Sequence, residues 1–425
     1  MKEHCISPRR GLTAATLCAF VGLLGVPSVL LAAESPGNDE VFTLKKTVAI
    51  TGLAAFDISW VDTTLKQYLL ADRTNATIDV IGTTDLTLDH QYTDHFAGAT
   101  GNNDTSGPNG VLTLKNTEGT EIWVGDGPTV LASATPPATC AMHTPFPTTQ
   151  GGNTFVTLGG KCSSVKVLSA TGTALKTIPT NGALRADELC FDPTDNLILV
   201  ANDADTPPFI SFISTKTFTV VKQVPFYQAT GGIEQCQWSP KTGQFYLNLP
   251  VVGNGPDGNV LVISPKTMTV VNTFDIPVAN CAAPQGMAIG PDNQILLGCN
   301  GKTSPGGSFN SVVINQNSGA IVATLVNLGG ADEVWFDEID DHWLISGGSH
   351  KASASDACNK QFGIVDTEGN KIDQITCLTS AANPHSIAGD NASGNVFVPV
   401  SGGVQVYTPS QPDDHPRFVL GRPTE

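Results

Sequence analysis

One polar position recurs seven times along the chain, and its spacing limits the possible folds more than any other feature. Each occurrence opens a short segment of alternating or β-branched residues, which is typical of a β-strand. The positions lie 52, 78, 47, 51, 47 and 53 residues apart. The recurring residues are Asp57, Asn109, Asp187, Glu234, Gln285, Asp332 and His385.

These spacings fit a four-stranded propeller blade, which usually takes about 40–50 residues. Six full units and a short seventh therefore predict an all-β, seven-bladed β-propeller. The long interval of 78 residues predicts an insertion at about 128–161, in the second blade. The seventh unit lacks an outer strand after GVQVYTP, and the strand-like segment 42–51 has no blade of its own. We expect this N-terminal strand to close the ring, because closure removes exposed strand edges.

The first 33 residues have the layout of a secretory signal peptide. Lys2, Arg9 and Arg10 precede a long apolar run that ends in small residues. An uncleaved membrane anchor is the alternative, because the run is near the length that spans a bilayer. We expect cleavage, a single propeller domain at 34–425, a secreted or periplasmic location and no membrane association afterwards.

The charge of the chain narrows the class of partner. The net charge is −17, and loss of residues 1–33 would leave about −19. Such an acidic surface repels phosphate backbones, so nucleic acid is not an expected partner. A small polar ligand or a protein is the expected partner, and the protein itself is expected to be a monomer.

Eight cysteines remain after the signal segment, and an even count in an exported protein predicts disulfides. Eight cysteines allow 105 pairings, so the predicted arrangement of the blades is needed to select among them. It favours pairs between consecutive cysteines. These pairs are Cys140–Cys162, Cys190–Cys236, Cys281–Cys299 and Cys358–Cys377.

Several segments resemble a known class of repeat. ADRTNATIDVIGTTDLTL resembles YVTN propeller repeats, and DPTDNLILVANDAD and SPKTGQFYLNLP are similar to NHL and YVTN units of secreted bacterial proteins. The resemblance covers nearly all of the mature chain and implies a propeller fold, in a group that includes binding proteins and proteins of unassigned role. More distant propellers, the SMP-30/gluconolactonase and paraoxonase-like enzymes, hold a divalent cation in the central channel.

In a propeller the innermost strand of each blade lines the central channel, so the seven recurring residues should surround one channel mouth. Clustered carboxylates repel one another unless a cation or protons intervene. We therefore expect a divalent cation, with Ca²⁺ favoured because it takes carboxylate and amide oxygens. The expected metal ligands are Asp57, Asp187, Glu234 and Asp332, and the expected ligand-binding residues are Asn109, Gln285, Arg73 and His350. A hydrated polar channel with no ligand is the alternative interpretation.

Three functions follow from this site. The leading hypothesis is an exported propeller that binds a cation or small polar ligand at the mouth. The first alternative is a metal-dependent hydrolase of lactonase or esterase type, with His385 and Asp187 as the catalytic residues. The second is a protein-interaction platform. Glu188 and Glu333, which follow two of the recurring residues, are expected to point between blades and accept hydrogen bonds there.

Overall fold

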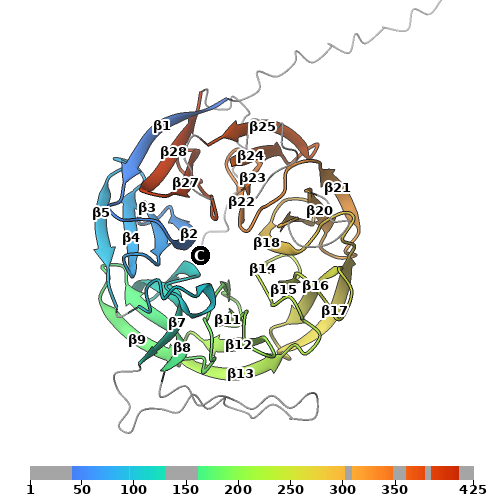
Figure 1. The fold of residues 1–425 in the computed structure, drawn as a ribbon, viewed down its shortest axis with the longest axis horizontal. Helices are drawn as coiled ribbons and strands as arrows, with labels where there is room; N and C mark the ends of the chain where they lie inside the picture. Colours follow the sequence, from blue (N-terminus) through green and yellow to red (C-terminus); the bar gives the residue numbers. More distant parts are fainter. Residues whose placement is uncertain are drawn as a thin grey trace, which may run out of the picture. The chain divides into compact units, whose positions relative to one another are not determined.

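The computed structural model describes residues 41–94, 96–130, 161–301, 309–347, 360–378 and 384–410. In this part of the chain, strands form seven antiparallel sheets of four strands each. The sheets are arranged as the blades of a ring (Figure 1). The predicted fold class, an all-β propeller with seven four-stranded blades, is confirmed.

The blades are numbered in chain order. Blade 1 contains β2 (Phe56–Asp62), β3 (Gln67–Asp72), β4 (Thr77–Gly82) and β5 (Leu88–Tyr92). A short 3-10 helix, η1 (Asn103–Thr105), precedes blade 2, which contains β6 (Val111–Asn116), β7 (Gly119–Val130), β8 (Lys161–Ser169) and β9 (Ala174–Pro179). Blade 3 contains β10 (Leu189–Asp192), β11 (Leu197–Asn202), β12 (Phe209–Ser214) and β13 (Thr219–Pro225). Blade 4 contains β14 (Cys236–Ser239), β15 (Gln244–Leu249), β16 (Gly258–Ser264) and β17 (Thr269–Ile276).

The remaining three blades follow the same order. Blade 5 contains β18 (Pro284–Ile289), β19 (Gln294–Cys299), β20 (Ser311–Asn315) and β21 (Ile321–Leu325). Blade 6 contains β22 (Val334–Asp337), β23 (His342–Gly347), β24 (Gln361–Asp366) and β25 (Lys371–Cys377). Blade 7 contains β26 (Ala388–Asp390), β27 (Asn395–Val400), β28 (Gly403–Pro409) and, as its outer strand, β1 (Phe42–Ala49).

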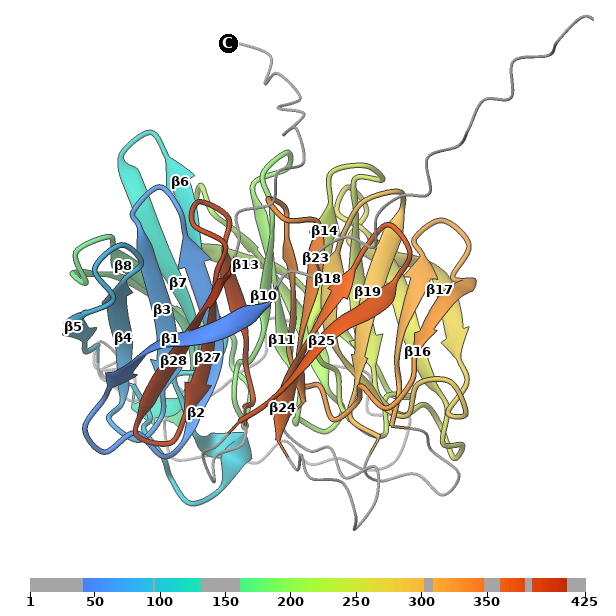
Figure 2. The same cartoon turned by 90° about the horizontal axis from the view of Figure 1, so that it is seen from above.

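The ring is closed by the two ends of the described chain. β1 pairs antiparallel with β28, with Phe42 opposite Pro409 and Val48 opposite Val404 (Figure 2). The innermost strands contact one another in a complete cycle, with β2 against both β6 and β26. The predicted closure by an N-terminal strand is therefore confirmed, and no innermost strand of the cycle lacks a neighbour on either side.

Apolar side chains hold neighbouring blades together. A central strand such as β11 is buried along its whole length, whereas an outer strand such as β9 is mostly exposed. One buried cluster joins Leu199 and Phe212 of blade 3 to Phe245 and Leu261 of blade 4. Hydrophobic burial of this kind is the main favourable term in folding, so the interfaces between blades act as the core of this ring.

Two disulfides lie within the described residues, and both were predicted. Cys190 is bonded to Cys236, which joins the innermost strands of blades 3 and 4, and Cys281 is bonded to Cys299 in blade 5. Cys162 and Cys377 are also disulfide-bonded. Their predicted partners, Cys140 and Cys358, lie outside the described residues. Bonded cysteines indicate an oxidising compartment.

Two other predictions fall mainly outside the described residues. These are the signal peptide at 1–33 and most of the insertion at 128–161, although β8 begins at the predicted end of that insertion. Across the ranges that the structure describes, no helix has both the length and the apolar character needed to cross a membrane.

Candidate functional site at the channel mouth

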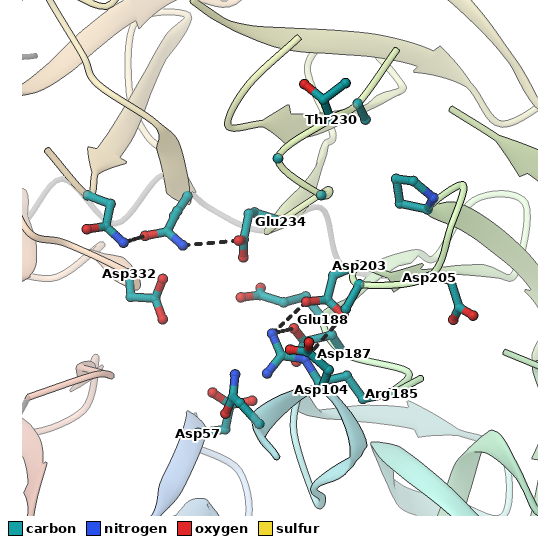
Figure 3. Close-up of a pocket in the computed structure, with 18 of the residues that line it drawn as sticks. Asp57, Asp104, Arg185, Asp187, Glu188, Asp203, Asp205, Thr230, Glu234 and Asp332 are labelled. Carbon is teal, nitrogen blue, oxygen red and sulfur yellow. Dashed lines mark hydrogen bonds and ion pairs between the residues drawn. The ribbon is translucent and has the colours of Figure 1, made fainter. Parts of the chain in front are cut away.

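A polar cavity of about 850 Å³ lies at one end of the central channel. Six of the seven recurring residues line it, although they come from six different blades. They are Asp57, Asp187, Glu234, Gln285, Asp332 and His385. Figure 3 shows several of these side chains around the open centre of the cavity. The strand spacing in the sequence therefore brings residues up to 328 positions apart to one place.

Arg73 fixes the side of the mouth formed by blades 1 and 2. Its guanidinium forms an ion pair with Asp57 and donates to Asn109 Oδ1 at 2.9 Å and to Asn103 Oδ1 at 2.6 Å. Asn109 in turn donates to the Ala186 carbonyl at 2.9 Å. Asn109, the seventh recurring residue, thus supports the wall of the cavity without lining it, and Arg73 neutralises a buried carboxylate.

Arg185 has a similar role in blade 3. Its Nη2 atom lies 2.7 Å from Asp187 Oδ2 and 2.6 Å from Asp203 Oδ2. The backbone holds Asp187 in place, because its N–H donates to the Ala201 carbonyl at 2.8 Å and its own carbonyl accepts from Gly110 at 3.2 Å. Position 110 needs glycine, since a Cβ atom there would lie 2.4 Å from that carbonyl oxygen.

His385 of blade 7 connects blade 1 to blade 6. Its Nε2 atom lies 2.7 Å from Asp57 Oδ1 and 2.7 Å from Asp332 Oδ2. Burial lowers the pKa of His385, but the two carboxylates outweigh that effect and raise the pKa well above its usual value. Burial also raises the pKa of Asp57, yet Arg73 and His385 together hold it well below its usual range. An imidazolium paired with two carboxylates is a poor general base.

Hydrogen bonds of side-chain amide groups fix the part of the mouth that blades 4 and 5 form. Gln285 Nε2 donates to Glu234 Oε1 at 3.0 Å, and Asn300 Nδ2 donates to Gln285 Oε1. Burial, followed by the nearby Asp332, raises the pKa of Glu234 to about 8. Asn300 directly follows the disulfide-bonded Cys299, so the Cys281–Cys299 bond anchors this part of the mouth.

Among the described residues that form the cavity wall, acidic groups greatly outnumber basic groups. The two basic side chains are Arg185 and His385. The acidic side chains are Asp57, Asp104, Asp187, Glu188, Asp203, Asp205, Glu234 and Asp332. Arg185 can balance only one of its two carboxylates, and burial raises the pKa of Asp187 well above its usual value. The described part of the wall therefore holds more carboxyl groups than its own cationic side chains can neutralise.

Two of these carboxyl groups have unused hydrogen-bonding capacity. The Glu188 side chain is only 6% exposed, it faces the cavity centre (Figure 3), and nothing in the described chain donates a hydrogen bond to it. The buried Oδ1 atom of Asp187 also has no partner. Burial, followed by the charges of Glu333 and Asp187, raises the pKa of Glu188 well above its usual value. Buried polar atoms normally have partners, so Asp187 Oδ1 points to a missing one, and the unpartnered Glu188 carboxyl group lines the same cavity.

The two glutamates that follow recurring residues behave differently. Glu333 accepts from Gln235 Nε2 at 3.0 Å and from the Ser386 hydroxyl, which belong to blades 4 and 7. Its predicted role between blades is confirmed. The same prediction was wrong for Glu188, which projects into the cavity. Strand alternation cannot separate the two cases, because both glutamates precede the first residue pair of their strands, β10 and β22.

The four residues predicted to bind a metal already have partners within the protein. Asp57 and Asp332 contact His385, Asp187 contacts Arg185, and Glu234 accepts from Gln285. In the described ranges, no three His, Cys, Asp or Glu side chains are grouped so that they could hold a metal ion. The residues therefore do not fit a resident metal, and the Ca²⁺ site stays a prediction without support from this geometry.

The other predicted roles have different outcomes. Arg73 lies at the mouth but is fully engaged with Asp57, Asn103 and Asn109. His350 lies outside the described residues. The catalytic roles of His385 and Asp187, and the hydrolase hypothesis built on them, stay predictions.

Sequence reasoning missed Arg185, Asp104 and Asp205. Asp205 accepts from the Ala183 N–H at 2.8 Å and lines the cavity away from the channel axis (Figure 3). Arg185 and Asp205 lie in loops and Asp104 lies in the short helix η1, so no strand periodicity marks any of them. The weak available signal for Arg185 was its position two residues before Asp187.

No protein-family model and no curated protein matches this sequence. The resemblance to YVTN and NHL repeats therefore extends to the propeller fold alone. A propeller with an open polar mouth is suited to binding a ligand or a partner.

Proposed function

We propose that the protein is an exported binding protein whose channel mouth takes a small, positively charged ligand. The observation that carries this proposal is the Glu188 carboxyl group, which is buried, faces the cavity and has no partner in the described chain. The orphan Oδ1 atom of Asp187 points to the same conclusion. The disulfides support export.

The buried carboxyl groups of the cavity explain why a cation is the favoured ligand. Burying an ionised carboxyl group is costly unless a positive charge or a proton accompanies it. In the free protein, raised pKa values leave some of these carboxyl groups protonated near neutral pH, with Glu234 at about 8. A bound cation would replace those protons. Ligand binding should therefore release protons and strengthen as pH rises toward 8.

The spacing of the acids favours an organic cation over a bare metal ion. Ca²⁺ needs six to eight oxygens at about 2.3–2.6 Å, and no such group is formed by the described acids. An ammonium or guanidinium group carries several N–H donors and can reach carboxylates that are farther apart. Ca²⁺ remains an alternative guest that the same experiment evaluates.

The test is calorimetric titration of the purified protein at constant ionic strength. Ethylammonium, Ca²⁺ and acetate are the probes, each in two buffers that differ in heat of ionisation. Ethylammonium should bind with proton release, and acetate should not bind. Replacing Glu188 by Gln keeps the shape and removes the charge, and it should weaken ethylammonium binding at least about tenfold, a loss typical of a charge-assisted hydrogen bond.

A matched control removes the same charge elsewhere. Asp275 is exposed on β17, and Asp275→Asn should leave the affinity unchanged. Equal binding of acetate and ethylammonium, or an unchanged affinity in Glu188→Gln, would contradict the proposal. Tight binding of Ca²⁺ alone would replace the organic cation with a metal ion.

A further inference from the structure

An apolar groove of about 620 Å³ adjoins the acidic cavity. Its floor is formed by the buried Leu249 and Leu261, and Phe226 and Val252 pack against the same cluster. Val270 of β17 lies at the rim, with 38% of its surface exposed. The groove lining contains no charged side chain among the described residues.

The two hollows share a wall. Tyr227 and Ala229 line both the acidic cavity and the apolar groove. Tyr227 is 37% exposed, so its ring remains accessible to a ligand. On the cavity side the wall continues with Pro207 and Pro208. The surface thus changes from strongly acidic to apolar over the few residues on either side of Tyr227.

Backbone hydrogen bonds hold this wall in place. The Phe226 N–H donates to the Pro208 carbonyl at 2.9 Å, and the Gly253 N–H donates to the Gln228 carbonyl at 2.8 Å. Ala229 also forms a β-bridge with Val252. A wall fixed to both neighbouring loops is preorganised, which lowers the entropy lost when a ligand binds.

We infer that the ligand is an amphipathic organic cation, with an ammonium group in the acidic cavity and an apolar chain that passes Tyr227 into the groove. The inference rests on the proposed function, because the acidic cavity supplies the position of the charged group. Charge complementarity fixes one end of the ligand, and the shared wall defines the direction of the other. The size of each hollow is within the range of small-molecule sites, which usually measure about 300–1,000 Å³.

The test uses a series of n-alkylammonium ions, from ethyl to octyl, with the matching alkanoates as anionic controls. A fully buried methylene contributes about fourfold to affinity, and a groove that is open on one side should give about half of that free energy. We expect the dissociation constant to fall roughly twofold for each added methylene. The alkanoates should not bind at any length.

Two neighbouring valines on β17 give a matched pair of variants. Val270 lines the groove, whereas Val271 is 56% exposed and does not line it. Val270→Asn should reduce the octyl-to-ethyl affinity ratio by about threefold or more, because a polar group then meets the chain. Val271→Asn should leave the ratio unchanged. Both substitutions are neutral, so they leave the charge of the cavity intact.

The possible failures are distinguishable. Ammonium binding that does not depend on chain length would overturn this inference and leave the proposed function standing. Absence of binding by every ammonium ion would remove the proposed function as well. If a short peptide with a basic residue beside an apolar residue bound while every alkylammonium ion failed, the small-molecule ligand would be wrong.

Discussion

The Nε2 atom of His385 lies 2.7 Å from Oδ1 of Asp57, although 328 residues separate the two in sequence. Asp332 Oδ2 lies at the same distance from that nitrogen. The contact joins blade 7 to blade 1 at the seam where the ring closes. It links the electrostatics of the mouth to the stability of the whole fold.

The contacts of His385 predict how its contribution to the free energy of unfolding depends on pH. The folded-state pKa is raised, so its contribution is complete below the unfolded value near 6.5 and is lost as pH rises through the folded value. The difference in unfolding free energy between wild type and His385→Gln should be largest below pH 6.5 and shrink at higher pH. Urea unfolding from pH 5 to 9 measures it. Replacement of the exposed His90 controls for loss of a histidine, and a pH-independent difference would contradict the expectation.

Replacing Glu333 should have the opposite effect to replacing His385, because the variant should be more stable than wild type at high pH. Burial raises its pKa to about 8, against 4.5 for an ordinary glutamate, so folding retains a proton that the unfolded chain loses. Between these values stability falls by up to roughly 1.4 kcal/mol per pH unit. Glu333→Gln has no such proton and can keep the bond to Gln235. It should be more stable than wild type at pH 8.5 and lose that advantage near pH 4.5.

The same urea series includes Glu338→Gln, which alters an exposed glutamate four residues before His342 on the same blade. This control should follow the wild-type curve at every pH. A Glu333→Gln variant that is less stable than wild type at pH 8.5 would show that the carboxylate is needed in the network.

Ring closure can be tested with two substitutions in one strand. Val48 of β1 is 4% exposed, and Leu44 of the same strand is 50% exposed. Val48→Asp places a charge in the apolar cluster between blades 7 and 1 and should lower the unfolding free energy by about 3 kcal/mol or more. Leu44→Asp should change it by no more than about 0.5 kcal/mol. Similar losses for both variants would mean that β1 contributes little to closure.

The two described disulfides should differ in their effect on stability. Cys190–Cys236 spans 46 residues and Cys281–Cys299 spans 18, and all four cysteines are buried. A bond that closes a longer loop restricts the unfolded chain more, by about 0.8 kcal/mol for these lengths. The double alanine variant of the longer bond should therefore be the less stable one in urea. The reverse order would indicate that native packing, rather than loop length, determines the loss.

Much of the fold follows from the sequence, because a blade repeats its strands and turns at a nearly constant spacing. Asp187 and His385 could be placed at one mouth by spacing alone, since each opens an innermost strand. The pairing of β1 with β28 was predictable because the last unit lacked a strand. Cys190 and Cys236 could be paired from their positions in neighbouring innermost strands.

The ion pairs and charge balance of the mouth were harder to predict from the sequence. Arg185 lies in a loop, and its contact with Asp203 depends on how that loop packs against blade 3. Without Arg185, the acids at the mouth favoured a metal ion. The groove beside Tyr227 could not be found from sequence, because its lining comes from two blades and has no shared spacing.

The pairing of β1 with β28 also sets the order of events during biogenesis. The final blade takes strands from both ends of the described chain, so it cannot be completed until the last strand has been synthesised. A chain that lacks its last strand therefore leaves blade 7 incomplete, and the mouth, which needs His385 of blade 7 against Asp57 of blade 1, cannot form before both segments are present. Only the complete, closed molecule would then present a finished binding cavity.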